Sequence, residues 1–224
     1  MTLTTDAMNR LVGLVDQALG LAEVQASQRV TQLRHEFPHD RPQHTIDRLE
    51  RQFSRTVTLT GAGTGAIAAA PGVGLGLAAG VAGGDLLAFL TAAATHVLAV
   101  AKVHGVEISR DTPTDLESRR TLLLGVLLGS PGAKVVLNAA GQTGARWGRL
   151  ITGTLPLRVL REVNRLLGGM LLRRFGPRAG LVAAIKVAPL GLGAVFGGGG
   201  NYLLARELIG STRAAFGTPT DDYR

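Results

Sequence analysis

Two histidines early in the chain have the spacing of a zinc motif. His35-Glu36-Phe37-Pro38-His39 matches H-E-x-x-H, in which both histidines lie one turn apart on one face of a helix. Pro38 removes a backbone donor and disfavours helical geometry at Phe37, so it breaks the turn that the motif needs. Thr45 stands where the extended motif has its third histidine. We therefore predict neither a metal site nor a cofactor.

A glycine-rich string raises a second enzymatic possibility, dinucleotide binding. Val57–Ala66 can be read as a strand that enters a turn containing Gly61, Gly63 and Gly65, with Asp85 about twenty residues further on. However, Pro71 follows within a few residues, and no alternation of strands and helices comes after it. A glycine fingerprint outside a βαβ unit is weak evidence, so we predict no catalytic residue.

Two isolated charges stand in otherwise apolar sequence, Asp85 and Lys186. One interpretation is structural: Asp85 satisfies backbone groups or pairs with Lys186, since buried charges are usually paired. The other is functional: protonation of Asp85 controls membrane insertion, or both side chains face a ligand pocket between the two glycine-rich segments. His96 and His104 are expected in the core or at a helix end.

A row of arginines gives the strongest surface signal. Helix 156–175 is predicted to carry Arg158, Arg161 and Arg165 on one face, with leucines and valines opposite. This pattern is typical of an interfacial helix on anionic lipid and equally of a surface helix in a basic protein. The predicted head-group-binding residues are Arg158, Arg161, Arg165, Arg173 and Arg174.

These residues must be positioned by helices, because helical periodicity runs through most of the chain. We expect helices over 5–35, from Gln43 onward, over 73–103 and over 113–128, then a looser segment at 133–153. Residues 61–84 contain nine Gly and eight Ala, and a second glycine-rich segment covers 179–205. Glycines four apart form a smooth stripe on a helix and allow close packing. The predicted packing glycines are Gly72, Gly76, Gly80, Gly84, Gly193 and Gly197.

Composition indicates the cellular compartment and the chemical class of the partner. The chain has 224 residues, no cysteine and a net charge of +8, all of which comes from residues 106–224. With no signal-like N-terminus, we expect a cytoplasmic protein. A one-sided basic block favours an anionic partner, and with only 4% aromatic residues a single-stranded nucleic acid is disfavoured. We expect an extension over 1–54, a helical domain over 55–216 and a disordered tail over 217–224.

Transmembrane helices are not favoured by length and charge. A spanning helix needs about 20 apolar residues, whereas the uncharged stretch before Pro71 has 15 residues, and the arm after it contains Asp85. The run from Val187 to Ala205 is interrupted by Pro189 and four consecutive glycines. Both segments therefore look better suited to packing on one another or to shallow insertion.

From about Arg55 to Phe216 the chain resembles the EcsC family. The resemblance rests on the glycine-rich run into Asp85, on the turn at His104-Gly105, where the family often has Tyr-Gly, and on a late motif. The positions that match the family are Asp85, Gly105, Lys186, Pro189, Gly191, Gly193 and Asn201. It implies an α-helical protein that works at the membrane, often encoded beside membrane transport genes, and it implies no catalytic residues.

The sequence thus predicts an all-α helical bundle with two glycine-zipper-like hairpin segments. We expect a non-enzymatic protein, bound peripherally to the inner face of the cell membrane through anionic lipid or a membrane protein. The alternatives are a soluble enzyme or lipid or nucleotide binder with a pocket between the glycine-rich segments, an integral protein with inserted hairpins, and a nucleic-acid binder that uses the basic block.

Overall fold

The computed structural model describes the backbone of residues 2–68, 75–106, 109–143, 146–151, 155–185 and 192–219. Within these ranges it also describes the side chains, except those of residues 1–7, 60–85 and 174–201. Within these ranges the chain is all-α, as predicted, with no strand. The helices, in chain order, are α1 (Thr2–Glu36), α2 (Pro42–Ala68), α3 (Leu75–Val103), α4 (Pro113–Leu128), α5 (Ser130–Ala139), α6 (Trp147–Leu150), α7 (Leu157–Ile185) and α8 (Leu192–Phe216).

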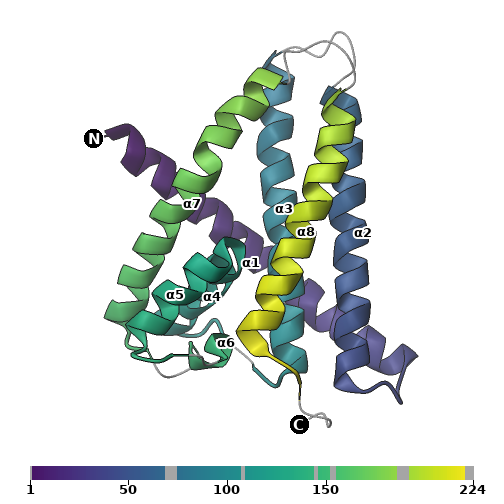
Figure 1. Ribbon diagram of the computed structural model, residues 1–224, viewed down its shortest axis with the longest axis vertical. Helices are drawn as coiled ribbons and strands as arrows, with labels where there is room; N and C mark the ends of the chain where they lie inside the picture. The colour runs from purple at the N-terminus through teal and green to yellow at the C-terminus, as the bar shows by residue number, and fades with distance from the viewer. Residues whose placement is uncertain are drawn as a thin grey trace.

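Three long helices form the upright part of the bundle. Helix α2 packs against both α3 and α8, α1 crosses α3, and α7 packs on α4 (Figure 1). The ends of α2, α3, α7 and α8 that border the two glycine-rich connections all lie at the same end of the molecule (Figure 1). We call this the distal end.

Two contacts define the antiparallel register of α2 with its neighbours. The ring of Phe53 stacks on His96 of α3, with 4.8 Å between centroids. The carboxylate of Glu50 accepts two hydrogen bonds from Arg213 of α8, at 2.6 and 2.5 Å. Since Glu50 is 8% exposed, this forked pair holds α8 to α2 at a nearly buried position.

Helix α4 begins as its sequence predicts. The Thr112 hydroxyl accepts from the Asp115 N–H at 3.2 Å, and the Asp115 carboxylate accepts from the Thr112 N–H at 3.1 Å. Pro113 occupies the first turn, where its missing donor costs nothing. This reciprocal capping box satisfies two donors that the helix leaves free.

Two predicted helix limits are wrong because proline can start a helix or lie inside one, as well as end one. Pro131 lies in the first turn of α5, which runs to Ala139, so it starts a helix that covers the first part of the segment 133–153 that we expected to be loose. Likewise α7 continues past Phe175 and through Pro177 to Ile185. An internal proline removes one hydrogen bond and kinks a helix without always ending it.

The predicted N-terminal extension contributes to the same core as the rest of the chain. The boundary expected between residues 54 and 55 falls inside α2, and Val15, Ala18 and Ala22 of α1 are buried in one hydrophobic cluster with residues of the later helices. Trp147 is 2% exposed and belongs to the same core. Residues 217–219 follow α8 outside any helix, and 220–224 lie outside the described residues.

Candidate functional site

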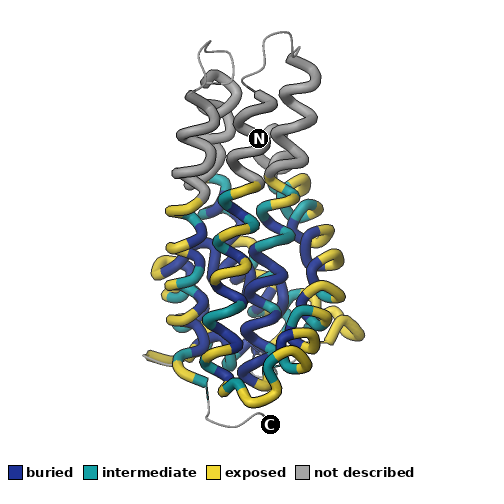
Figure 2. Tube along the Cα trace, turned by 90° about the vertical axis from the view of Figure 1, so that its right-hand side faces the viewer, coloured by how far each residue is buried: buried dark blue, intermediate teal, exposed yellow. Residues whose placement is uncertain are grey.

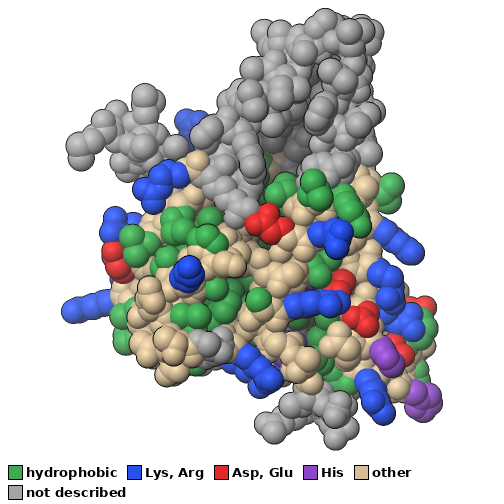
Figure 3. Space-filling model, in the orientation of Figure 1, with side chains coloured by type: hydrophobic (Ala, Val, Ile, Leu, Met, Phe, Trp, Pro, Cys, Tyr) green, Lys and Arg blue, Asp and Glu red, His purple; other side chains and the backbone are tan. Residues whose placement is uncertain are grey.

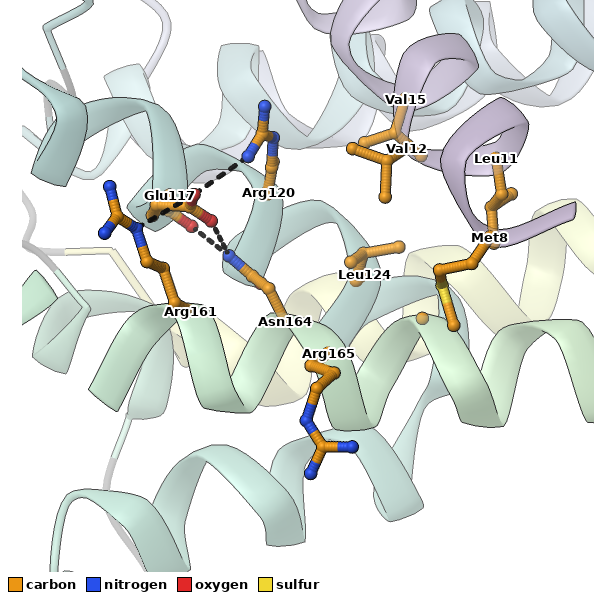
Figure 4. A pocket seen from close by; sticks show the side chains of 11 residues that line it. Met8, Leu11, Val12, Val15, Glu117, Arg120, Leu124, Arg161, Asn164 and Arg165 are labelled. Carbon is orange, nitrogen blue, oxygen red and sulfur yellow. Dashed lines mark hydrogen bonds and ion pairs between the residues drawn. The ribbon is translucent and has the colours of Figure 1, made fainter. Parts of the chain in front are cut away.

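A cleft of about 230 Å³ lies between α1, α4 and α7. One half is apolar and the other polar (Figure 4), and the lining residues are Met8, Leu11, Val12, Val15, Glu117, Arg120, Leu124, Arg161, Asn164, Arg165 and Gly168. Gly168 lies against α1 here, where a Cβ would lie 2.9 Å from the sulfur of the flexible Met8 side chain. The cleft therefore has the amphipathic lining of a small-ligand site.

The polar half of the cleft is held together by hydrogen bonds between side chains. Asn164 donates to the Glu117 carboxylate at 2.7 Å and accepts from the Thr121 hydroxyl at 2.8 Å. Arg120 donates to Glu117 at 2.9 Å, and to Asp16 of α1 at 2.5 and 2.6 Å. The hydrogen bond to Asp16 raises the pKa of Arg120. Because Glu117 accepts from both Arg120 and Asn164, it anchors α7 to α4.

The predicted head-group arginines of α7 are exposed on one face of the helix. Arg165 bonds to Glu162 at 2.5 Å with both side chains more than half exposed, and this hydrogen bond lowers the pKa of Glu162. Arg161 lies 3.9 Å from Glu117. Arg158 and Arg173 are exposed, and no described acidic side chain pairs with them. The side chain of Arg174 lies outside the described residues. The four described arginines thus share a surface, but acids partly offset the charge of two.

A second surface borders the distal end. Leu59, Leu86, Tyr202 and Leu203 are 72, 42, 45 and 66% exposed, and they come from α2, α3 and α8. Figure 3 shows hydrophobic side chains on the α2–α8 side directly below the atoms that are not described. Beyond these residues α2, α3 and α8 carry no charge from Thr56 to Gly84 or from Leu192 to Ala205, and Asp85 stands next to Leu86. Helix α7, which ends at the same end of the molecule, carries Arg174 and Arg178 in its last part. Single exposed leucines are ordinary, whereas a group at one level suggests a contact surface.

One described segment passes the length and hydropathy test for a membrane span. Leu86–Val103 of α3 has a mean hydropathy of 1.8 over 18 residues, but 56% of it is buried inside the bundle. Figure 2 shows the buried positions gathered along the inner sides of the helices, with exposed positions around them. This segment has the burial expected of a core helix in a bundle.

Both predicted core histidines are buried. His96 is 3% exposed, and neither ring nitrogen has a hydrogen-bond partner among the described residues. Burial, and to a lesser extent Arg29, lowers the pKa of His96 to about 3. His104 follows the end of α3 and stacks on Phe216 with 5.3 Å between centroids. Burial together with Arg149 and Arg146 lowers its pKa to about 4.

The two enzymatic motifs do not have the geometry that their chemistry needs. Helix α1 ends at Glu36, so His35 and His39 do not lie on one helical turn. Over the described residues, no cluster of three His, Asp or Glu side chains is placed to hold a metal ion. Val57–Ala66 belongs to α2, so the strand that a dinucleotide turn requires is instead a helix.

Most of the predicted glycine and family-motif positions are described only in part. Gly76, Gly80, Gly84 and Asp85 lie in α3, and Gly193, Gly197 and Asn201 lie in α8, with their surroundings outside the described side chains. Gly72, Lys186, Pro189 and Gly191 lie outside the described residues, and so does any pocket between the glycine-rich segments.

Gly105 is the one family-motif position that the structure describes in full. It has φ +70° and ends α3, while Val106 N–H donates to Ala101 C=O at 2.9 Å. That conformation explains glycine at this position.

The sequence patterns did not predict the cleft, its hydrogen bonds between Glu117 and Asn164, or the exposed apolar border of the distal end, which is formed by Leu59, Leu86, Tyr202 and Leu203. The cleft joins residues far apart in the chain, and periodicity does not reveal such pairs. The border had a readable signal, because Arg55 and Arg206 mark the points where charged sequence becomes uncharged.

The chain matches no protein-family model, no curated protein and no solved structure. Its resemblance to the EcsC family therefore stays a prediction.

Proposed function

We propose that this protein binds peripherally to the inner face of the cell membrane, with its distal end entering anionic lipid. The observation that carries the proposal is the group of exposed apolar side chains, Leu59, Leu86, Tyr202 and Leu203, at the base of helix segments that are almost without charge. Exposure of such an apolar surface to water is unfavourable, and contact with lipid or with a membrane protein would cover it.

The arginine face of α7 would provide electrostatic attraction. Each well-placed basic residue near an anionic surface contributes about 1 kcal/mol. Arg173 should contribute most, because Arg158 lies about 22 Å further from the distal end along α7 and the charge of Arg165 is offset by Glu162. In this mechanism α7 attracts the protein to the membrane, and the apolar distal end then holds it there.

Co-sedimentation with vesicles tests the apolar surface. The variant Leu59→Asn/Leu203→Asn should bind anionic vesicles about tenfold less tightly, because two leucine side chains no longer leave water. Leu21→Asn/Leu116→Asn is the matched control, since these leucines are 49 and 44% exposed on α1 and α4. Equal binding by both variants would contradict the proposal.

Salt and charge substitution test the electrostatic step. Binding should be stronger for anionic than for neutral vesicles and should weaken at high salt. Replacing Arg158, Arg161, Arg165, Arg173 and Arg174 with glutamine should remove most of that preference. Unchanged binding would exclude this role for α7, and resistance of the membrane-bound protein to a carbonate wash would favour an integral protein.

The cleft favours a second function, binding of a small amphiphile. An apolar cavity of about 150 Å³ accepts benzene, so the cleft has room for a slightly larger apolar group beside the polar half formed by Glu117 and Arg161. Displacement of a fluorescent fatty acid would test it. Val12→Trp should block the cleft and abolish the signal, and a signal that persists in this variant would exclude the cleft.

A further inference from the structure

Two arginines lie where the charged sequence of the bundle ends. Arg55 of α2 is the last charged residue before an uncharged stretch to the end of the helix, and Arg206 of α8 is the first charged residue after one. Both side chains are exposed, and no described acidic side chain pairs with either. They come from different helices and stand 151 positions apart in the chain.

The packing of α2 against α8 brings these arginines to one level. The helices are antiparallel, and Glu50 contacts Arg213. Counting along both helices from that contact places Arg206 level with Val57, only about 3 Å along the axis from Arg55. The same count places Leu203 level with Thr60, about one turn closer to the distal end.

The contact between α2 and α3 allows positions on α3 to be compared with positions along α2. From the stacked pair Phe53 and His96, counting along both helices puts Leu86 about level with Gly63. Arginines therefore come first along the axis, exposed apolar side chains follow within about one to two turns, and the rest of α2 is uncharged.

The length beyond the arginines fits one leaflet of a bilayer. From the level of Arg206 to Ala68, the end of α2, there are 11 residues, or about 16 Å at 1.5 Å per residue. Half of a hydrocarbon core of about 30 Å is about 15 Å. The described part of α2 would therefore reach the middle of the bilayer when the two guanidiniums are at the head groups.

The described acids nearest in sequence to these arginines do not pair with them. Glu50 is bonded to Arg213, and the Glu207 carboxylate lies close to Gly129, at the junction of α4 and α5. Two exposed guanidiniums without an acid partner have the donor geometry that recognises phosphate.

We propose that Arg55 and Arg206 form a head-group girdle, which binds phosphates of anionic phospholipids and limits how deeply the distal end enters the bilayer. The girdle rests on the proposed function and is distinct from the arginine face of α7.

A charge-matched pair of variants tests the girdle. Arg55→Gln/Arg206→Gln removes two positive charges at the girdle, and Arg41→Gln/Arg51→Gln removes two from exposed positions further from the distal end. If the girdle binds phosphate, the first variant should lose at least about tenfold in affinity for anionic vesicles and the second less than about threefold. Equal losses would show that only net charge matters and would overturn the girdle.

The depth of insertion is measured with one fluorescent label. Because the chain has no cysteine, a single introduced cysteine carries that label. Leu203→Cys, carrying an environment-sensitive fluorophore, should be quenched more by lipids brominated near the head group than by lipids brominated near the chain end. In the background of Arg55→Gln/Arg206→Gln this difference should shrink.

The outcomes separate the two proposals. Wild-type protein that does not bind vesicles would overturn both the membrane function and the girdle. Wild-type protein that binds and inserts Leu203, while both charge variants behave alike, would overturn the girdle and leave the membrane function standing.

Discussion

Replacement of His96 by leucine should change how the stability of this protein depends on pH. The imidazole is buried against Phe53, and its pKa falls from 6.5 to about 3 on folding. Between these values the unfolded chain binds a proton that the folded protein does not. Protonation therefore favours the unfolded state, and stability falls as the pH falls from 6.5 toward 3.

The magnitude follows from the two pKa values. Each pH unit within that window costs about 1.4 kcal/mol, so at about pH 5 the wild type should have lost about 2 kcal/mol through this residue. His96→Leu lacks the ionisable ring and should not show this loss. Near pH 7.5 the imidazole is neutral in both states, and the variant should be equally or more stable, because two ring nitrogens without described partners are removed.

Urea denaturation followed by far-UV circular dichroism measures the effect. The free energy of unfolding is compared for wild type, His96→Leu and the exposed control His39→Leu at about pH 7.5 and about pH 5. The wild type and the control should lose about 2 kcal/mol more than His96→Leu. Contributions from His104 and the carboxylates cancel in the comparison. If all three proteins lost the same stability, His96 would ionise as freely when folded as when unfolded, and the reasoning would fail.

Two further substitutions test the packing of the bundle. Glu50→Ala should lower the free energy of unfolding by about 1–2 kcal/mol, because the two hydrogen bonds to Arg213 are lost. The loss is no larger because the Arg213 guanidinium is more than half exposed and becomes hydrated instead. A change under about 0.3 kcal/mol in urea denaturation would show that the pair is not formed in solution. Gly125→Ala should also destabilise, by about 1–3 kcal/mol, since its Cβ would lie 2.7 Å from the rigid indole of Trp147; a higher melting temperature in calorimetry would show that helix propensity outweighs the clash.

Local signals determined much of the fold. The cap at Thr112, the turn at Gly105 and the all-helical character were readable because each depends on neighbours within a few residues. Where a local signal had two meanings, the prediction failed. Pro131 starts α5 instead of leaving a loose segment, and a proline in either role looks the same in sequence.

The candidate site was predicted only in part. The exposed arginine face of α7 followed from helical spacing, whereas the partners Glu117 and Glu162 reduce the free charge of Arg161 and Arg165. Leu21 and Val24 also look like core residues of an amphipathic helix, yet they are 49 and 57% exposed. Periodicity identifies a face, but the width of the face that is covered depends on which helix packs there.

The sequence by itself determined the helices, the absence of cysteine chemistry and the separation of charged from uncharged segments, since composition and short-range periodicity specify these properties. Only the tertiary structure decided that Arg55 and Arg206 share one level, that Glu50 meets Arg213, and that α1 closes a cleft on α4 and α7. These relations depend on the register between helices, which long-range side-chain packing fixes and which no local pattern encodes.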